Sequence, residues 1–426
     1  MSSTSIARYA IVLGLITAVG PAGIDMYLPS LPSIGRTLNA SPPMAQATLM
    51  AFYLALGVGQ LVAGPLSDMF GRKPPMYIGL GAFLAASIGC ALAPNVEALV
   101  AFRLLQGLGA CAAMVTPRAV VRDLYTGPTA ARLMSLLLIV YSVSPILAPL
   151  AGSAISDLTG WRGVFWALAL VAVLALAMIA TRLPETRPAK DRLESTLGGA
   201  LSGYRTLLSD GRFLSLALIA SCCLATFFVY VANSSFVFIG HYGVTPRVYA
   251  LLFALNAVTL VLVSQFNGWL TARLGLRETV RVAVVCQAVT IAFLLALTWA
   301  GVDRLELLVT ALLVVYGLNG VIVPSTFVLA MEEHAPLAGS ASASIGMLNF
   351  AGGALAMALV APFSNGTPLP MITGISACSA VALGLALYAL RRTRLNTVPT
   401  GASRQPVELR VAVDQHLKQR GQGPNH

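Results

Sequence analysis

The segment RGVFWALALVAVLALAMIAT, residues 162–181, carries a single charged side chain, at its first position. As an α-helix this segment is about 30 Å long, which matches the hydrocarbon thickness of a bilayer. Similar stretches recur along all 426 residues, of which 57% are hydrophobic and only 10% are charged. Because a soluble domain carries roughly a quarter charged residues, we predict an all-α integral membrane protein.

Charged, glycine-rich or proline-rich breaks divide the chain into twelve apolar segments. The first set of predicted spans covers residues 9–31, 46–68, 75–94, 98–117, 133–156 and 162–181. The second set covers residues 213–238, 246–271, 279–300, 305–330, 338–361 and 369–390. We therefore expect an N-terminal six-helix bundle (1–183), a solvated cytoplasmic linker (184–211), a C-terminal six-helix bundle (212–392) and a disordered cytoplasmic tail (393–426).

The net charge of +11 follows from basic residues that are spread over many loops. With the N-terminus inside, 22 of the 27 Lys and Arg residues fall in cytoplasmic segments and four in outer loops. Without the four most distal tail residues the count is still 18 against four, so the positive-inside rule places both termini in the cytoplasm. Because no single basic stripe forms, we expect no nucleic-acid partner.

A trace of an internal repeat survives in two equivalent loops. GPLSDMFGRK, residues 64–73, aligns with GWLTARLGLR, residues 268–277, at a constant offset. Two glycines, a leucine and a terminal basic residue match. Duplicated halves are a common construction in transporters. Glycine and basic residues suit a very short connection between helices, although a turn that only orients the chain is an alternative interpretation.

Four motifs resemble the major facilitator superfamily, and within it the drug:proton antiporters with twelve helices. GPLSDMFGRKP (64–74) is similar to the signature of the loop between helices two and three. RLLQGLGACAA (103–113) resembles the proton-antiporter signature of helix four, and SPILAPLAGS (144–153) that of helix five. IDMYLPSLP (24–32) resembles the first-helix signature of the Bcr/CflA drug-resistance branch.

The resemblance implies two six-helix bundles that rock around a central cavity between inward-open and outward-open states. It also implies a conformational switch, to which we assign Gly64, Asp68, Gly71, Arg72, Lys73, Pro145, Pro149 and Gly152. The pattern has two departures. Met69 stands where a basic residue is more frequent, and Ala148 where many exporters have glycine. Prolines in a spanning helix favour a kink, which could also be purely structural.

Two charged residues lie deep within the predicted spans, Asp25 in the first and Arg103 in the fourth. Their similar depth, roughly 7 Å from the outer ends of their helices, means that they could form an ion pair. An intramembrane charge costs several kcal/mol and therefore indicates function. We assign proton coupling to Asp25 and Arg103, with a static structural bridge as the alternative.

The expected substrate cavity combines aromatic and amide side chains of both halves. The candidates are Tyr27, Tyr53, Gln106, Tyr141, Phe227, Tyr230, Asn233, Asn256 and Asn319. Such a neutral, partly aromatic wall suits an amphiphilic ligand. Ordinary helix packing explains any single member equally well.

Together these features predict a proton-coupled multidrug or antibiotic efflux transporter in the inner membrane of a bacterium. The alternative is a proton-coupled transporter of a narrow metabolite or nutrient. An embedded enzyme is disfavoured, because the four histidines form no cluster with acidic or nucleophilic residues. We expect small drug-like substrates, a surrounding lipid bilayer, a monomer, no metal, and no cofactor besides the proton gradient.

Overall fold

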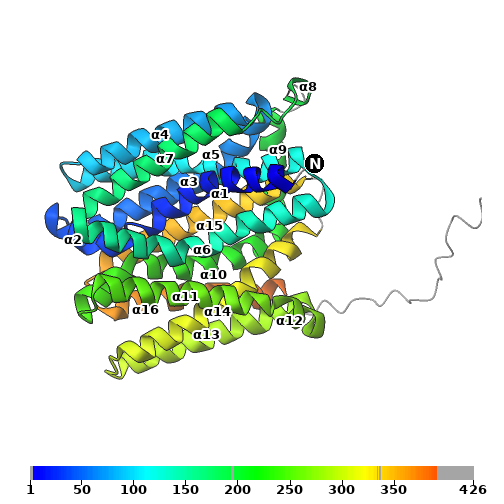
Figure 1. Ribbon diagram of the computed structural model, residues 1–426. Helices are drawn as coiled ribbons and strands as arrows, with labels where there is room; N and C mark the ends of the chain where they lie inside the picture. Colours follow the sequence, from blue (N-terminus) through cyan, green and yellow to red (C-terminus); the bar gives the residue numbers. More distant parts are fainter. Residues whose placement is uncertain (1–2, 193–195, 333, 335–336, 391–426) are drawn as a thin grey trace, which may run out of the picture. The chain divides into compact units, whose positions relative to one another are not determined.

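The computed structural model describes residues 3–192, 196–332, 334 and 337–390, and the predicted tail at 393–426 lies outside them. These described residues form helices and contain no β-strand. Twelve helical segments among them are long and apolar enough to cross a membrane. The predicted all-α membrane fold is therefore confirmed, and the helices run side by side in Figure 1.

The first six spans match their predicted positions. The first comprises α1 (Ser3–Asp25), the short η1 (Leu28–Ser30) and α2 (Leu31–Thr37). The next five are α3 (Pro42–Phe70), α4 (Lys73–Leu92), α5 (Val96–Leu124), α6 (Gly127–Thr159) and α7 (Trp161–Arg182). Helices α5 and α6 extend several residues beyond the apolar segments, because polar residues at helix ends can continue a helix outside the lipid.

The interval between the two sets contains helices that were not predicted from the sequence. It contains the short α8 (Ala189–Arg192) and the longer α9 (Leu197–Ser209). One face of α9, with Gly203, Tyr204 and Leu207, is buried, and the helix packs against α3, α10 and α15. Helix α9, which was not predicted from the sequence, is thus an amphipathic helix that covers the adjoining spans. The assignment of this interval as a cytoplasmic linker stays a prediction.

The second six spans also lie where the sequence places them. They are α10 (Gly211–Ser235) with the π-helical turn η2 (Phe236–His241), α11 (Pro246–Gln265), α13 (Leu276–Trp299), α14 (Leu305–Met331), α15 (Ala338–Val360) with η4 (Ala361–Phe363), and α16 (Pro368–Ala389). The predicted span 246–271 ends early, at Gln265, and a separate helix α12 (Asn267–Leu274) follows it.

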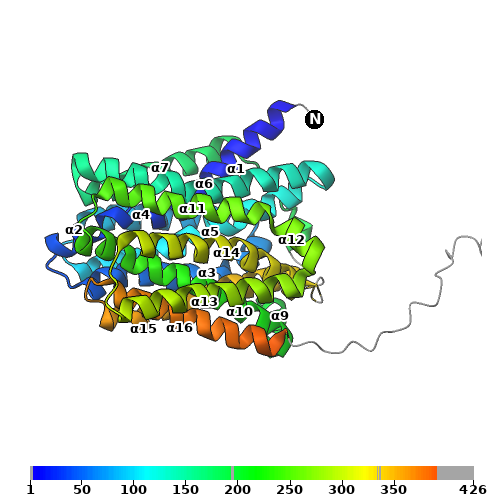
Figure 2. The ribbon, with the colours of Figure 1, turned by 90° about the horizontal axis from the view of Figure 1, so that it is seen from below.

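Two sides of the helix array are distinguished by the connections that they carry. We call the side of α8, α9 and α12 the linker side, and the side of α2 the far side; Figure 1 shows them at opposite ends of the helices. Across the halves, α3 packs against α15 and α6 packs against α11, and Figure 2 shows the same array from below. One compact unit results, so the boundary between two bundles stays a prediction.

The repeated loop has the same backbone conformation in both halves. Gly71 has φ +95° and Gly275, at the equivalent position, has φ +81°. Each ends one helix and precedes the next, since α3 stops at Phe70 and α12 at Leu274. A residue with a side chain rarely adopts this left-handed conformation. Glycine is thus needed here for the turn.

Candidate functional site

Arg103 is completely buried in the first half. Its Nη1 donates hydrogen bonds to the Gly23 carbonyl at 2.8 Å and to Oε1 of Gln106 at 2.6 Å. Its guanidinium lies over the rings of Tyr27, at 4.3 Å, and Phe52, at 4.2 Å. Aromatic faces attract a cation more strongly where water is excluded. These contacts hold a charge at membrane depth, although Nε and Nη2 have no hydrogen-bond partner.

The position at which α1 ends explains why Arg103 finds a backbone carbonyl as its hydrogen-bond partner. The last four carbonyls of a helix lack an intrahelical donor, and α1 ends at Asp25, so the Gly23 carbonyl belongs to this group. A cation is stabilised at a helix C-terminus. Gly107 permits the arrangement, because a Cβ there would overlap the carbonyl oxygen of Phe52. Close packing of α3 on α5 thereby places Phe52 over the guanidinium.

Asp25 lies beside this cluster without joining it. Its side chain is 4% exposed, yet its carboxylate forms no hydrogen bond or ion pair with any residue that the structure describes. The ion pair with Arg103 that the similar depths suggested is absent from this structure, and so is the static bridge. The physical reason is that the Gly23 carbonyl and two aromatic rings already accommodate the guanidinium.

The fifth span contacts α1 next to Asp25. A Cβ on Gly152 would overlap the carbonyl oxygen of Met26, so only glycine permits this approach of α6. The helix continues without interruption through Pro145 and Pro149. Ala148, the departure from the family pattern, is buried and does not prevent the contact.

Most of the predicted cavity residues are packed between helices. Tyr27 bonds to Thr48, Gln106 to Ser87 and Asn256 to Tyr230. The remaining members are likewise occupied: Tyr53 packs against Phe228 and Phe350, Phe227 against Tyr316, Asn319 against Gln287, and Tyr141 donates to the Met114 carbonyl. None of the nine lines the described cavity. In this state the aromatic groups pack on one another, and the assignment of these nine residues to a substrate cavity stays a prediction.

Asn233 belongs to a set of contacts that close the far side. Its Oδ1 accepts hydrogen bonds from Gln46 at 3.0 Å and from Ser364 at 2.7 Å. These bonds join α3 of the first half to α10 and to Ser364, which follows η4. Nearer the surface, Arg247 and Asp157 form an ion pair at 3.0 Å between α11 and α6. The two halves therefore meet on the far side.

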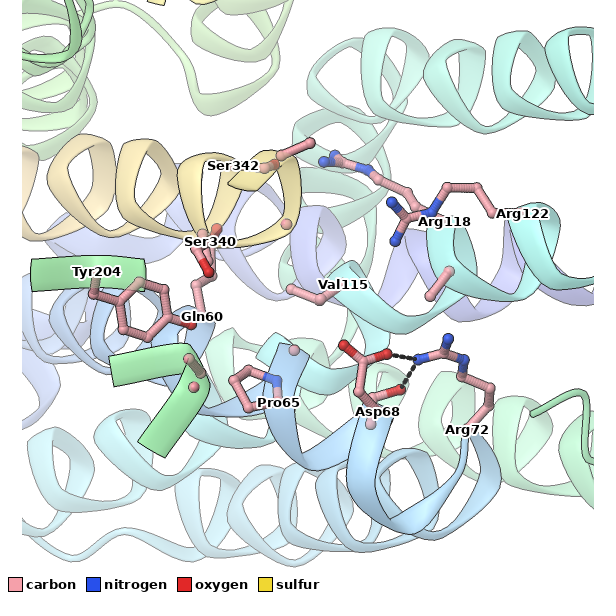
Figure 3. A pocket seen from close by; sticks show the side chains of 18 of the residues that line it. Gln60, Pro65, Asp68, Arg72, Val115, Arg118, Arg122, Tyr204, Ser340 and Ser342 are labelled. Carbon is pink, nitrogen blue, oxygen red and sulfur yellow. Dashed lines mark hydrogen bonds and ion pairs between the residues drawn. The ribbon is translucent and has the colours of Figure 1, made fainter. Parts of the chain in front are cut away.

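On the linker side the halves separate around a cavity of about 570 Å³. Its walls come from α3, α5 and α6 of the first half, from α14 and α15 of the second, and from α9 (Figure 3). Three predicted switch residues, Gly64, Asp68 and Arg72, line it. A volume of this size accommodates a drug-like molecule. The structure is thus open on the linker side and closed on the far side.

The loop motif forms a charge network at the mouth of this cavity. Arg72 pairs with Asp68 at 2.7 Å and with Asp123, at the end of α5, at 2.6 Å. Burial opposes the charge, but the hydrogen bonds to Asp123 and Asp68 raise the pKa of Arg72 above its ordinary value. Arg187 adds a contact to Asp68 at 3.5 Å. This charge network forms although Met69 supplies no basic group.

Glu185 ties the same loop to the chain after α7. Its carboxylate accepts hydrogen bonds from the backbone N–H groups of Arg72, at 2.8 Å, and Lys73, at 3.0 Å. A Cβ on Gly71 would lie 2.7 Å from Glu185 Oε2, so glycine is required for space as well as for conformation. The Lys73 ammonium instead lies over the Tyr77 ring, at 5.7 Å.

Sequence reasoning missed both carboxylate partners of this network. Asp123 follows the apolar part of helix four, and Glu185 lies in the interval interpreted as linker. The only sequence signal was an excess of acidic and basic residues near the same membrane face. The second half has Ala272 and Leu276 at the positions equivalent to Asp68 and Arg72, so the repeat there cannot form the same ion pair.

Comparison with known proteins identifies the family. The model of the Major Facilitator Superfamily matches residues 13–357. The chain belongs to this superfamily. It is 37% identical to the MFS-type transporter YdgK of Bacillus subtilis, over 91% of the chain and 96% of the relative. It is 29% identical to the bicyclomycin resistance protein homolog of Haemophilus influenzae, over 91% and 97%.

The fold of this superfamily member agrees with solved transporter structures. A bacterial homologue of the human lysosomal transporter Spinster, in an inward-facing and occupied conformation, matches with a TM-score of 0.71. The match covers 92% of this chain and 98% of the other, at 14% sequence identity. The resemblance to the Bcr/CflA drug-resistance branch is confirmed by relatives named for bicyclomycin and multidrug resistance. The protein is a multi-pass membrane transporter.

Proposed function

We propose that this protein exports small amphiphilic antibiotics or other toxic compounds from a bacterial cytoplasm in exchange for protons. The linker side would face the cytoplasm, because the basic residues gather there. The protein would reside in the inner membrane with both termini inside. The antibiotic-resistance names of its relatives support the substrate class, and the outward direction follows from that class.

The observation that carries proton coupling is the isolated Asp25 carboxyl. A buried carboxylate without a counter-charge or hydrogen-bond donor is costly in a medium of low polarity. Asp25 would therefore hold a proton while the far side is closed. In the state that is open on the far side, water would reach the place where α1 and α6 meet, at Met26 and Gly152, and Asp25 would take up a proton from outside. Protonation would permit the empty carrier to close there, and binding of a compound from the linker side would then release this proton to the cytoplasm.

Arg103 would assist as a positioning group for the anion. Its Nε and Nη2 are buried without partners, and the Gly23 carbonyl that it contacts lies two residues before Asp25. A shift of the α1 end would bring those donors toward an ionised carboxylate and stabilise it. The Arg72 network would act separately, holding the linker-side ends of α3 and α5 in one state and releasing them in the other.

The compound class is tested by a drug-susceptibility panel that includes bicyclomycin, in a bacterium lacking its own pumps, with and without expression. Expression should raise the inhibitory concentration of at least one compound. Unchanged susceptibility throughout, with the protein present in the membrane, would favour the narrow-metabolite alternative.

Coupling is tested in everted vesicles with a compound found in that panel. Asp25→Asn mimics the protonated side chain, so it should insert and bind but lose pH-gradient-driven accumulation. Asp25→Glu keeps a titratable carboxyl and should retain part of the pH-gradient-driven accumulation. Uphill accumulation by Asp25→Asn at the wild-type rate would refute the assignment of Asp25 as the proton carrier.

A further inference from the structure

The cavity on the linker side contains more positive than negative charge. Among its lining residues, Asp68 and Arg72 neutralise each other through their ion pair. Arg118 and Arg122 also line the cavity. Neither forms a hydrogen bond or ion pair with a carboxylate in the part of the chain that the structure describes, and the Arg118 guanidinium lies over the Tyr141 ring, at 5.2 Å.

Both arginines occupy the same face of α5. Residues four apart in a helix are neighbours, and like charges at this spacing repel each other. Figure 3 shows both guanidinium groups directed into the space between α5 and α15, where Ser340 and Ser342 lie. A cleft lined by one sign of charge focuses its field on an oppositely charged solute. An arrangement that is unfavourable when empty would thus be relieved by an anion.

The remaining walls suit the rest of an amphiphile. Val115, Met134 and Phe327 provide apolar surface beside the arginines, and Gln60 and the two serines provide polar atoms. The Tyr204 hydroxyl is already used, because it donates to the Leu61 carbonyl at 2.9 Å. Cationic and apolar groups therefore share one cavity of about 570 Å³.

We propose that Arg118 and Arg122 form a binding site for the anionic group of an amphiphilic compound, such as a carboxylate, sulfonate or phosphate. The planar guanidinium matches the geometry of these groups. The site rests on the proposed export function only in that the bound compound is then transported. The same chemistry is offered by the headgroup of an anionic lipid that enters from the bilayer.

Binding of three dansyl probes distinguishes these cases without any transport. Dansylglycine carries a carboxylate, its methylamide is neutral, and a dansyl quaternary ammonium is cationic. The purified full-length protein is placed in phosphatidylcholine nanodiscs and the fluorescence gain is titrated. The wild type should prefer dansylglycine. Arg118→Gln/Arg122→Gln should weaken its binding by roughly tenfold and leave the neutral probe unchanged. Arg118→Glu/Arg122→Glu should prefer the cationic probe.

The matched control is Arg277→Gln/Arg281→Gln, which removes two arginines at the same spacing on α13, away from the cavity lining. It should bind all three probes as the wild type does. Equal weakening by both double variants, or no preference for dansylglycine in the wild type, would overturn the proposal. Nanodiscs that also contain phosphatidylglycerol identify the source, since a lipid in the site would compete with dansylglycine in the wild type alone. A failed export assay would leave these binding results intact.

Discussion

At the scale of single residues, Arg103 shows how a membrane protein can hold a cation without a carboxylate. Two aromatic rings, one helix-terminal carbonyl and one glutamine side chain surround it. Asp25 is buried separately. The charge of Arg103 is therefore stabilised by its own surroundings, and in this state it does not depend on Asp25.

This separation predicts that Asp25→Asn and Arg103→Gln act independently on folding. Breaking a buried ion pair by removing one partner costs about 3–5 kcal/mol. A double-mutant cycle for two unpaired groups should instead give a coupling free energy below about 0.5 kcal/mol. Equilibrium unfolding in mixed detergent micelles measures the four free energies of unfolding. A coupling comparable to that of an ion pair would mean that Asp25 and Arg103 are paired while the far side is closed.

Glu185 predicts a pH dependence of stability. Burial raises the pKa of this carboxyl, but hydrogen bonds from the N–H groups of Arg72, Arg187 and Lys73 outweigh it and lower the pKa below the ordinary value of 4.5. Its contribution is therefore complete above pH 4.5 and is lost as the pH falls through the lower folded value. Glu185→Gln should flatten the decline of the melting temperature in acid.

The control for this experiment is Glu97→Gln, which removes a carboxylate in the first turn of α5, outside the network. Its melting temperature should fall in acid as steeply as that of the wild type. If Glu185→Gln keeps the wild-type slope, the acid sensitivity originates elsewhere.

At the scale of helices, glycine determines how closely the spans approach. Gly152 contacts the backbone of Met26, so a Cβ at this position has no room. A Cβ at Gly64 would meet no atom within 4 Å, because this glycine lines the open cavity. Packing in this state thus requires glycine at position 152 but not at position 64.

Identical substitutions at these two positions should therefore differ in effect. Gly152→Ala should lower the free energy of unfolding by roughly 1–3 kcal/mol, because overpacking displaces α6 from α1. Gly64→Ala should change it by less than about 0.5 kcal/mol. Unfolding of the purified variants in detergent provides the comparison, and equal losses would contradict the packing at Gly152.

At the scale of the whole molecule, one side is open and the other is closed. The far side is joined through Asn233 and through the Asp157–Arg247 ion pair. The linker side holds the cavity. A transporter with this asymmetry should expose its cavity to one compartment only.

Thiol labelling tests this arrangement and the orientation together. In a variant whose native cysteines are replaced, Ser340→Cys places a thiol in the cavity, and Ser364→Cys places one at the closed far side. An impermeant maleimide should label the first from the cytoplasmic face of everted vesicles and spare the second from either face. Labelling of Ser340→Cys from the periplasmic face alone would reverse the proposed orientation.

The positions of the spans could be predicted from the sequence alone. Apolar length determines where a helix can cross lipid, and no tertiary contact is needed for that decision. The repeat also predicted the equivalent turns at Gly71 and Gly275, because a left-handed backbone selects glycine locally. The membrane depths of Asp25 and Arg103 followed from the same count of residues along each helix.

Only the tertiary structure decided which side chains meet. The depth of a residue along its helix does not determine how the helix is rotated or which partners compete for the side chain. In the structure, Arg103 contacts the Gly23 carbonyl and forms no ion pair with Asp25. The predicted cavity residues pack on one another, because the far side is closed in this state. Arg118 and Arg122 line the cavity for the opposite reason, since the halves separate around the end of α5. Rotation and separation of packed helices are properties of the assembled array, which no single segment encodes.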